Sequence, residues 1–270
     1  MVMIDWIDRY IVEDDEFDRA YELVSSKERA VIKKSIAQLF DFYLKSALIK
    51  EISIKFKRGF EFFLNTFPCK WGIILTNGKI NPSQVIAVSV LAVMSEVENL
   101  FFIQTKKRGK KIDELTLLSL ELSGCNSVYL ISAKEIKRLL LDLLGKSASG
   151  FLIVIGDEDF LIKIQKGIRD LNFYKCFFLN ALKKAFVFPK KEFDIDLIKR
   201  FNPYLDIKVL ENIDKIDVNS FEVGYVTREW RSRFSKKIPY LFGPGQEGFW
   251  FWKELNPFML KEQSVEVWED

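Results

Sequence analysis

Histidine is absent from this sequence of 270 residues. Because imidazole is the usual general base of enzymes and the commonest metal ligand, its absence removes every Ser-His or Cys-His nucleophile pair. Carboxylate pairs remain as candidate acid/base groups, for example Asp157 with Asp159 and Asp194 with Asp196. Acidic residues near helix starts are, however, the expected complement of the helix dipole. Neither pair is therefore predicted to be an acid/base dyad.

Cysteine is scarce as well. Cys69, Cys125 and Cys176 lie far apart in the sequence, and no CxxC motif occurs. An odd number of widely spaced cysteines favours neither a disulfide framework nor a cysteine zinc site. We predict three reduced thiols in the core.

Glycine and proline are also few, with 13 and 7 residues, which excludes collagen-like and low-complexity chains. Hydrophobic residues make up 49% and charged residues 29% of the chain, so it is not a disordered protein. The longest stretch without a charge, Ile80 to Ser95, is shorter than the roughly 20 apolar residues that cross a bilayer. The start, Met1 to Trp6, lacks the pattern of a signal peptide. We expect a cytoplasmic protein that does not enter a membrane.

The charges are nearly balanced. Lys and Arg number 41 and Asp and Glu 38, which gives a formal net charge of +3 and predicts ordinary solubility rather than a polyanionic partner. The densest basic run, Lys106 to Lys111, has no interleaved aromatic residues of the kind that single-stranded nucleic acids stack on. We interpret it as a solvated loop and expect no nucleic-acid partner.

The centre of the chain contains four short apolar runs that read as buried strands: 71–76, 99–105, 127–131 and 151–155. They begin 24 to 28 residues apart, and each gap holds a helical pattern. Predicted helices start at Asn81-Pro82, near Asp113 and at Ser132. Apolar strands alternating with helices indicate parallel strands covered on both faces. We predict an α/β fold built on a doubly wound, mostly parallel sheet.

The regions on either side of this centre differ in character. Residues 1–65 read as a helical N-terminal segment, with a helix over 26–46 whose start has capping-box spacing at Ser25 and Glu28. The α/β core is expected over 66–210, with further elements near 158–171, 174–179, 185–188, 192–201 and 207–210. The remainder, 211–270, is predicted to be a loop-rich, aromatic extension that packs on the core.

Ligands of open parallel sheets bind beyond the carboxyl ends of the strands. Helix starts at this edge present free N–H groups that suit a phosphate or carboxylate. The predicted cofactor-binding residues are Asn77, Asn81, Ser83, Thr105, Ser132 and Lys134. Capping of their own helices is an alternative explanation for Asn81 and Ser132. Neither the GxGxxG nor the GxxxxGK[ST] phosphate-binding fingerprint is present.

A glycine-rich segment, Gly243 to Gly248, precedes four consecutive aromatic residues, Phe249 to Trp252. No strand-to-helix context surrounds the glycines, so a phosphate cradle is not expected. The glycines are expected to let the chain turn closely while the rings pack on the body. If the rings were exposed instead, Phe249, Trp250 and Trp252 would form an apolar patch that could join copies of the chain.

The central region resembles histidinol dehydrogenases over roughly residues 66–156. The stretches that carry the resemblance are Pro68 to Ser83, Leu91 to Ile103, Glu121 to Tyr129, Ala133 to Ile136 and Gly150 to Ile155. The resemblance implies an aldehyde-dehydrogenase-like α/β fold with an NAD site at the strand ends. It also implies zinc and a catalytic Glu-His pair that oxidise an alcohol to an acid in two steps.

The sequence departs from that family in several respects. No histidine is present to bind zinc or carry a proton, the paired glycines before Ala133 are missing, and Lys134 stands where the family has glutamine. We therefore expect no zinc and consider NAD the candidate cofactor. The favoured hypothesis is a catalytically silent scaffold that binds a small molecule or a protein. The alternative is an NAD(P)- or nucleotide-dependent enzyme that uses carboxylates at the strand ends, such as Asp157.

Overall fold

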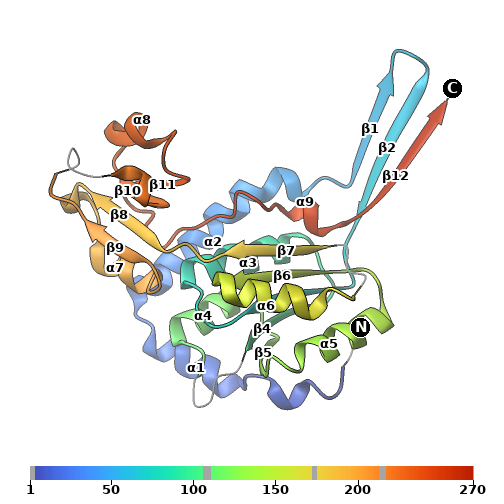
Figure 1. The fold of residues 1–270 in the computed structure, drawn as a ribbon, viewed down its shortest axis with the longest axis horizontal. Helices are drawn as coiled ribbons and strands as arrows, with labels where there is room; N and C mark the ends of the chain where they lie inside the picture. Colours follow the sequence, from blue (N-terminus) through green and yellow to red (C-terminus); the bar gives the residue numbers. More distant parts are fainter. Residues whose placement is uncertain (1–3, 106–110, 172–174, 213–216, 270) are drawn as a thin grey trace.

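The computed structural model describes residues 4–105, 111–171, 175–212 and 217–269. Within these ranges the strands form a five-stranded, a four-stranded and a three-stranded sheet. Figure 1 shows the five-stranded sheet in the body, the four-stranded sheet beside it, and the three-stranded sheet reaching away as an arm. Residues 106–110 of the predicted basic loop lie outside the described residues. No described helix has the length and apolar character needed to cross a bilayer.

The five-stranded sheet confirms the predicted doubly wound arrangement. Its strand order is β5-β4-β3-β6-β7, and every neighbouring pair is parallel. The strands are β3 (Trp71–Thr76), β4 (Leu100–Thr105), β5 (Val128–Ile131), β6 (Gly150–Gly156) and β7 (Cys176–Asn180). Because the chain winds outward from β3 in both directions, the strand order reverses between β3 and β6. This is the place where open α/β sheets bind ligands.

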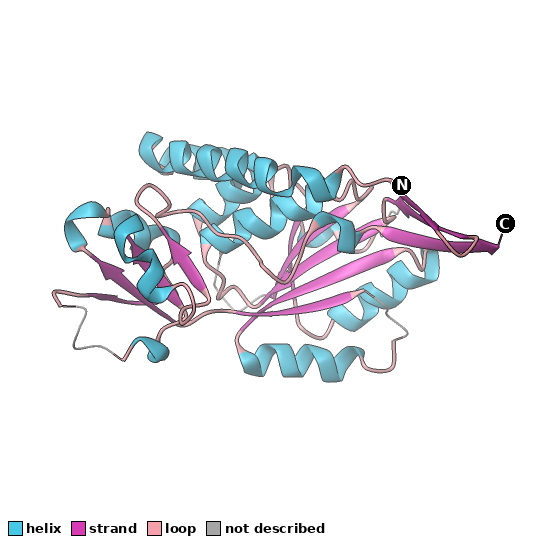
Figure 2. Cartoon of the chain, turned by 90° about the horizontal axis from the view of Figure 1, so that it is seen from above, coloured by secondary structure: helices cyan, strands magenta, loops and turns pink. Residues whose placement is uncertain are grey.

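Helices cover both faces of this sheet, as Figure 2 shows. One face packs on α1 (Asp14–Leu23), α2 (Ser26–Ala47), α3 (Pro82–Met94) and α4 (Glu114–Leu122), with Ile74, Phe102 and Ile153 from the strands. The other face packs on α5 (Ile136–Lys146) and α6 (Glu158–Ile168), with Ile73, Ile103 and Leu152. Adjacent residues of each strand thus face opposite layers, which explains why the strands are apolar throughout.

The helix starts agree with the sequence in most places. The Oγ of Ser25 accepts a hydrogen bond from the backbone N–H of Glu28, and the Glu28 carboxylate accepts one from the N–H of Ser25, which confirms the predicted capping box. Asp113 caps α4 by accepting from the N–H of Thr116. The prediction for α5 is wrong by four residues, because this helix begins at Ile136 and not at Ser132.

The second sheet is also parallel, with the order β11-β10-β8-β9. It consists of β8 (Lys184–Phe188), β9 (Asp206–Val209), β10 (Val223–Val226) and β11 (Tyr240–Phe242), with α7 (Ile195–Phe201) between β8 and β9. The predicted strands near 185–188 and 207–210 are confirmed as β8 and β9, which pair with each other, and β8 also pairs with β10 from the C-terminal region. The division of the chain into segments 1–65, 66–210 and 211–270 stays a prediction.

Short elements complete the fold. They are α8 (Arg231–Phe234), α9 (Pro257–Leu260) and 3-10 helices at Asp8–Tyr10, Lys190–Glu192, Val218–Ser220 and Arg228–Trp230.

The arm is an antiparallel sheet of β1 (Glu51–Phe56), β2 (Phe60–Phe67) and β12 (Glu262–Glu269), with β2 in the middle. The prediction that 1–65 is helical is therefore wrong from Glu51 onward. The hairpin is closed by Gly59, whose φ of 83° lies in the region that favours glycine. β12 comes from the far end of the sequence, so the sequence around β1 and β2 does not show that a third strand joins them.

The aromatic segment near the C-terminus is packed into the chain. The Trp250 side chain is fully buried and stacks on Tyr240, with ring centroids 5.0 Å apart, and Trp252 is buried beside it. A Cβ on Gly248 would lie 2.4 Å from Cγ1 of Val31, so the glycine permits the close approach to α2. Intramolecular packing is the correct interpretation, and the idea that these tryptophans join copies of the chain is wrong because they expose almost no surface.

Candidate functional site

A crevice with a volume of about 360 Å³ opens at the carboxyl ends of β3 and β4. Its walls come from the loop after β3, the end of β4, the start of α4 and the segment that follows α7. Two of the predicted cofactor-binding residues, Asn77 and Thr105, line it. The residues that sequence reasoning missed here include Lys79, Lys111, Thr116, Arg200 and Tyr204.

The loop after β3 has a defined local structure. The Oδ1 of Asn77 accepts a hydrogen bond from the backbone N–H of Lys79 at 3.1 Å, which closes a tight turn. Gly78 lies at its centre with a φ of 76°, and a Cβ there would come within 2.9 Å of the Gln104 side chain. The glycine thus lets the loop lie directly against the end of β4.

One cation of the crevice, Lys79, is engaged by a carboxylate across the sheet. Its Nζ donates to Oδ2 of Asp157 at 2.7 Å, and Asp157 lies just beyond the end of β6. This ion pair joins the ends of β3 and β6 at the place where the strand order reverses. The hydrogen bond from Lys79 is the main reason why the pKa of Asp157 lies below its ordinary value. Asp157 also caps α6 by accepting from the N–H of Phe160.

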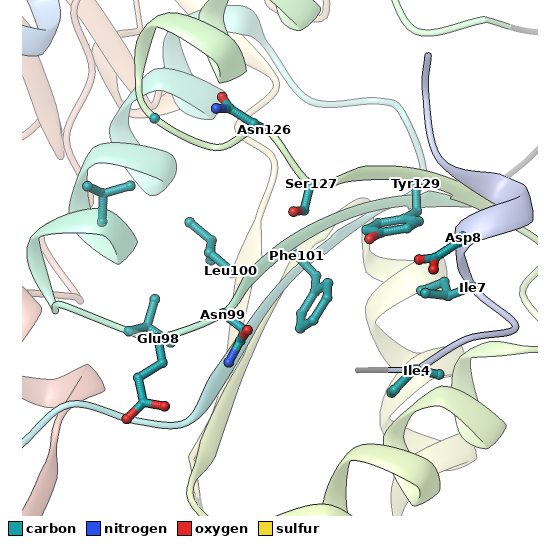
Figure 3. A pocket seen from close by; sticks show the side chains of 13 residues that line it. Ile4, Ile7, Asp8, Glu98, Asn99, Leu100, Phe101, Asn126, Ser127 and Tyr129 are labelled. Carbon is teal, nitrogen blue, oxygen red and sulfur yellow. The ribbon is translucent and has the colours of Figure 1, made fainter. Parts of the chain in front are cut away.

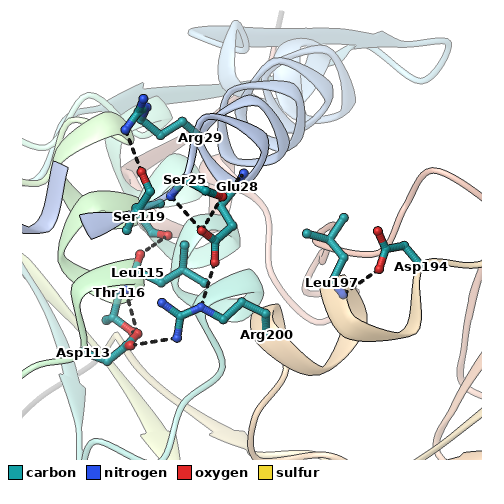
Figure 4. A network of polar contacts seen from close by, with 11 residues as sticks. Ser25, Glu28, Arg29, Asp113, Leu115, Thr116, Ser119, Asp194, Leu197 and Arg200 are labelled. Atoms are coloured by element: carbon teal, nitrogen blue, oxygen red, sulfur yellow. Dashed lines mark hydrogen bonds and ion pairs between the residues drawn. The ribbon is translucent and has the colours of Figure 1, made fainter. Parts of the chain in front are cut away.

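The second cation, Arg200, connects three helices (Figure 4). Its Nε donates to Oε1 of Glu28 at 2.8 Å, and its Nη1 donates to Oδ1 of Asp113 at 3.4 Å. Partial burial alone would raise the pKa of Glu28, but hydrogen bonds from Ser25 and Arg200 hold it below its ordinary value. The third cation, Lys111, pairs with Glu16 at 3.0 Å. Each basic side chain that lines the crevice therefore has an acidic partner.

Asn81 and Ser83, predicted to bind a cofactor, are fully buried. The Oδ1 of Asn81 accepts from the N–H of Tyr204 at 2.9 Å, and the Oγ of Ser83 donates to Oδ1 of Asn202 at 2.6 Å. The segment after α7 thus covers the start of α3. Both side chains are thus engaged within the protein, and their assignment to a cofactor stays a prediction.

Burial of this helix start also bears on NAD. In doubly wound sheets the pyrophosphate of a dinucleotide rests on the N-terminus of the helix that follows the first strand. Here that helix is α3, whose start is covered by Asn202 and Tyr204. The residues of this chain therefore do not fit a dinucleotide bound in that way.

Ser132 and Lys134 lie beyond the end of β5 and do not line the crevice. The N–H of Ser132 donates to Oε2 of Glu135 at 3.1 Å, and Lys134 is exposed. Glu135 also accepts from the Tyr10 hydroxyl, which lowers the pKa of its carboxyl. The structure thus brings Asn77 and Thr105 together and places the other four predicted residues elsewhere.

The three cysteines are free thiols. Cys69 and Cys125 are buried, and Cys176 is partly buried. Burial raises the pKa of Cys69 to about 11 and those of Cys125 and Cys176 to about 12. Because the thiolate is the nucleophile and metal ligand, all three are poor candidates for either role near neutral pH. In the described ranges, no three acidic or thiol side chains gather closely enough to hold a metal ion.

Another cavity, of about 470 Å³, lies near the amino ends of β4 and β5. Figure 3 shows the Tyr129 ring between Ser127 and Asp8, with Phe101 beside it. The acidic residues that line this cavity are Asp8 and Glu98, and Glu98 forms an ion pair with Lys70. This edge is opposite to the one at which parallel sheets bind ligands, so the crevice beside β3 remains the expected site.

No model of a known protein family matches the sequence. The histidinol dehydrogenase of Thermococcus kodakarensis is 27% identical over 119 residues, a match that covers 44% of this chain and 31% of that protein. The chain thus aligns with less than a third of the curated relative.

Among solved structures, the histidinol dehydrogenase from Elizabethkingia anophelis matches with a TM-score of 0.58 at 12% identity, over 97% of this chain and 77% of that one. An aldehyde dehydrogenase from Bacillus cereus, solved with NAD+, matches with a TM-score of 0.49 at 5% identity, over 87% of this chain and 76% of that one. The chain is therefore similar to histidinol dehydrogenase in sequence and shares its α/β fold.

Proposed function

We propose that this chain is a catalytically silent scaffold that assembles with a second copy of itself through the apolar face of the arm. The observation that carries the proposal is the arm itself, which presents a continuous apolar face that no other described part of the chain covers. The proposal keeps the dehydrogenase-like fold and assigns it a binding role.

The side chains present support the absence of catalytic activity. The reaction implied by the resemblance uses zinc and a Glu-His pair, and the sequence has no histidine. The carboxylates whose pKa values are shifted, Glu28, Glu135, Asp157 and Asp194, are all shifted downward, whereas a general acid near neutral pH needs a raised value. The alternative of a carboxylate-dependent enzyme is less well supported, because Asp157 is engaged by Lys79.

The apolar face follows from the register of the three strands. Ile54 of β1 and Val267 of β12 both pair with Phe62 of β2, so these three side chains lie in one row. Residues two positions away point to the same side. The complete face consists of Ile52, Ile54, Phe56, Phe60, Phe62, Leu64, Val265 and Val267.

These side chains do not belong to the core. None of the eight is part of the hydrophobic clusters of the body, and Val265 and Val267 are 58% and 61% exposed. The opposite face is mostly polar and contains the ion pair of Lys55 with Glu61. A contiguous exposed apolar surface on a protein marks an interaction site.

A second copy of the chain is the partner that best fits this face. The apolar rows span five residues along β2, so strands about 4.8 Å apart with about 3.4 Å per residue give an apolar face of roughly 14 by 17 Å. Two such faces in contact bury less than the roughly 1,000 Å² expected of a stable interface, so they fit a weak contact that depends on protein concentration. The face is also apolar along most of its length, as a self-complementary twofold interface requires.

The test is the molecular mass in solution, measured by light scattering over a range of concentrations. We expect the wild-type mass to rise toward twice the chain mass of 31.6 kDa as the concentration increases, and Val265→Asp to keep the single-chain mass. Ser264→Asp is the matched control, because it adds the same charge to the adjacent residue on the polar face. A wild-type monomer, or equal loss in both variants, would contradict assembly through this face. Turnover of a histidinol-like alcohol with NAD would separately contradict silence.

A further inference from the structure

A cavity of about 390 Å³ lies at the carboxyl ends of β10 and β11 in the second sheet. Val226 and Thr227 follow β10 into its wall, and Phe242 and Gly243 do the same from β11. The rule that places ligands beyond the carboxyl ends of parallel strands applies to this sheet as it does to the first. The volume falls within the range of roughly 300 to 1,000 Å³ that is typical of small-molecule sites.

The walls of this cavity are largely apolar. The apolar lining residues come from β10, from the segment between β10 and β11, from β11 and from the loop after it, and they are Val226, Ile238, Pro239, Leu241, Phe242 and Pro244. Val226, Ile238 and Phe242 are buried, so this part of the wall is held in place by the core of the second sheet. Contact with the aliphatic or aromatic body of a ligand would bury these side chains and make the free energy of binding more favourable.

Among the residues that the structure describes, the charged lining residues are Arg228 and Arg231, and none of the lining residues is acidic. In the part of the chain that the structure describes, neither guanidinium forms an ion pair, although Glu229 follows Arg228 directly and accepts a hydrogen bond from the Thr227 hydroxyl. Glu192 and Glu229 lie in a neighbouring shallow cavity that shares Arg228. Guanidinium groups suit carboxylate and phosphate oxygens, to which they can donate two parallel hydrogen bonds.

We infer that this cavity binds a small amphiphilic anion, with the anionic group at Arg228 and Arg231 and the apolar body against Ile238, Leu241 and Phe242. Carboxylates and phosphate monoesters share the required chemistry. The inference does not depend on the assembly of the arm, because the cavity and the arm share no residue.

The test is calorimetric titration of the full chain with octanoate and octyl phosphate, below the concentrations at which they form micelles. We expect saturable binding of at least one of them, and the tighter ligand identifies the anionic group. Octan-1-ol and octylamine should bind at least tenfold more weakly, because they lack the negative charge. Shortening the chain of the tighter ligand should weaken binding roughly fourfold for each methylene removed.

Variants locate the site. Arg231→Gln should weaken binding at least tenfold, and Arg228→Gln with Arg231→Gln should abolish it. Lys236→Gln is the matched control, since Lys236 is a nearby exposed cation that does not line the cavity. Failure of both anions to bind, equal affinity for octan-1-ol, or an equal loss in Lys236→Gln would each overturn the inference.

Discussion

The two parallel sheets end in cavities of similar size, but their charges are arranged differently. Beside β3, the cations Lys79, Lys111 and Arg200 each have an acidic partner. Beside β10, the structure shows no ion pair for Arg228 or Arg231 in the described residues. A ligand anion must displace a carboxylate at the first edge but not at the second. Basic residues in a cavity are thus an incomplete sign of anion binding, because the partners they already have decide what they can still bind.

The pairing at the first edge belongs to a structural junction. Asn202 is fully buried, accepts from the Ser83 hydroxyl, and donates to the carbonyl oxygen of Glu247 and to the hydroxyl of Tyr225, both at 3.2 Å. It therefore connects α3 of the first sheet with β10 of the second. This junction closes the helix start at which a phosphate would otherwise bind.

The largest expected effect comes from breaking this junction. Asn202→Ala leaves the buried polar groups of Ser83 and Glu247 without their partner, and we expect the free energy of unfolding to fall by about 2 to 4 kcal/mol. Urea denaturation measures the change. Asn126→Ala, at an exposed asparagine, should have almost no effect. A loss below the experimental error in Asn202→Ala would show that the junction does not hold the two sheets together.

A smaller effect is expected from Arg200→Met. This change keeps the aliphatic part of the side chain but removes the contacts to Glu28 and Asp113. Because the Arg200 side chain is 44% exposed, we expect a loss of only about 1 kcal/mol. Lys199→Met removes an adjacent exposed charge and is the control. If the two variants lost equal stability, the ion pairs of Arg200 would contribute nothing measurable.

The sequence predicted β3, β4, β5 and β6 of the first sheet because each is a short apolar run between helical patterns. It could also identify the start of α3 at Asn81 and Pro82. It could not show that the backbone N–H of Tyr204, more than 120 residues later, donates a hydrogen bond to the Asn81 side chain. Lys79 was within reach of sequence reasoning, since it follows the turn residues Asn77 and Gly78. Arg200 lies on α7, between two strands of the second sheet, and no local pattern indicated that it lines the crevice.

The arm shows why a pattern can mislead. Phe56, Phe60 and Phe63 are spaced by four and three residues, as on a helix. In the structure Phe56 and Phe60 instead stack across the hairpin, with ring centroids 4.2 Å apart, and Phe63 points to the other face of the sheet. The pairing of Phe62 with Val267 spans about 200 residues, so no local pattern contains it.

The smallest expected effect, and the sharpest test of the comparison between the two edges, concerns Asp157. Asp157→Asn keeps an oxygen that can cap α6 but removes the negative charge, so Lys79 loses its ionic partner. Inorganic phosphate should then bind at the crevice of the variant and not of the wild-type protein, as chemical shifts of the crevice amides would show.

The pKa of Asp157 is lowered in the folded protein, so its stabilising contribution is present above the unfolded pKa of about 4 and is lost as the pH falls through the folded value. The stability difference between wild type and Asp157→Asn should therefore be small at neutral pH and vanish in acid. The control for phosphate binding is Asp159→Asn, which removes a nearby charge that makes no hydrogen bond to Lys79. If this control also bound phosphate, net charge rather than the ion pair of Lys79 would distinguish the two edges.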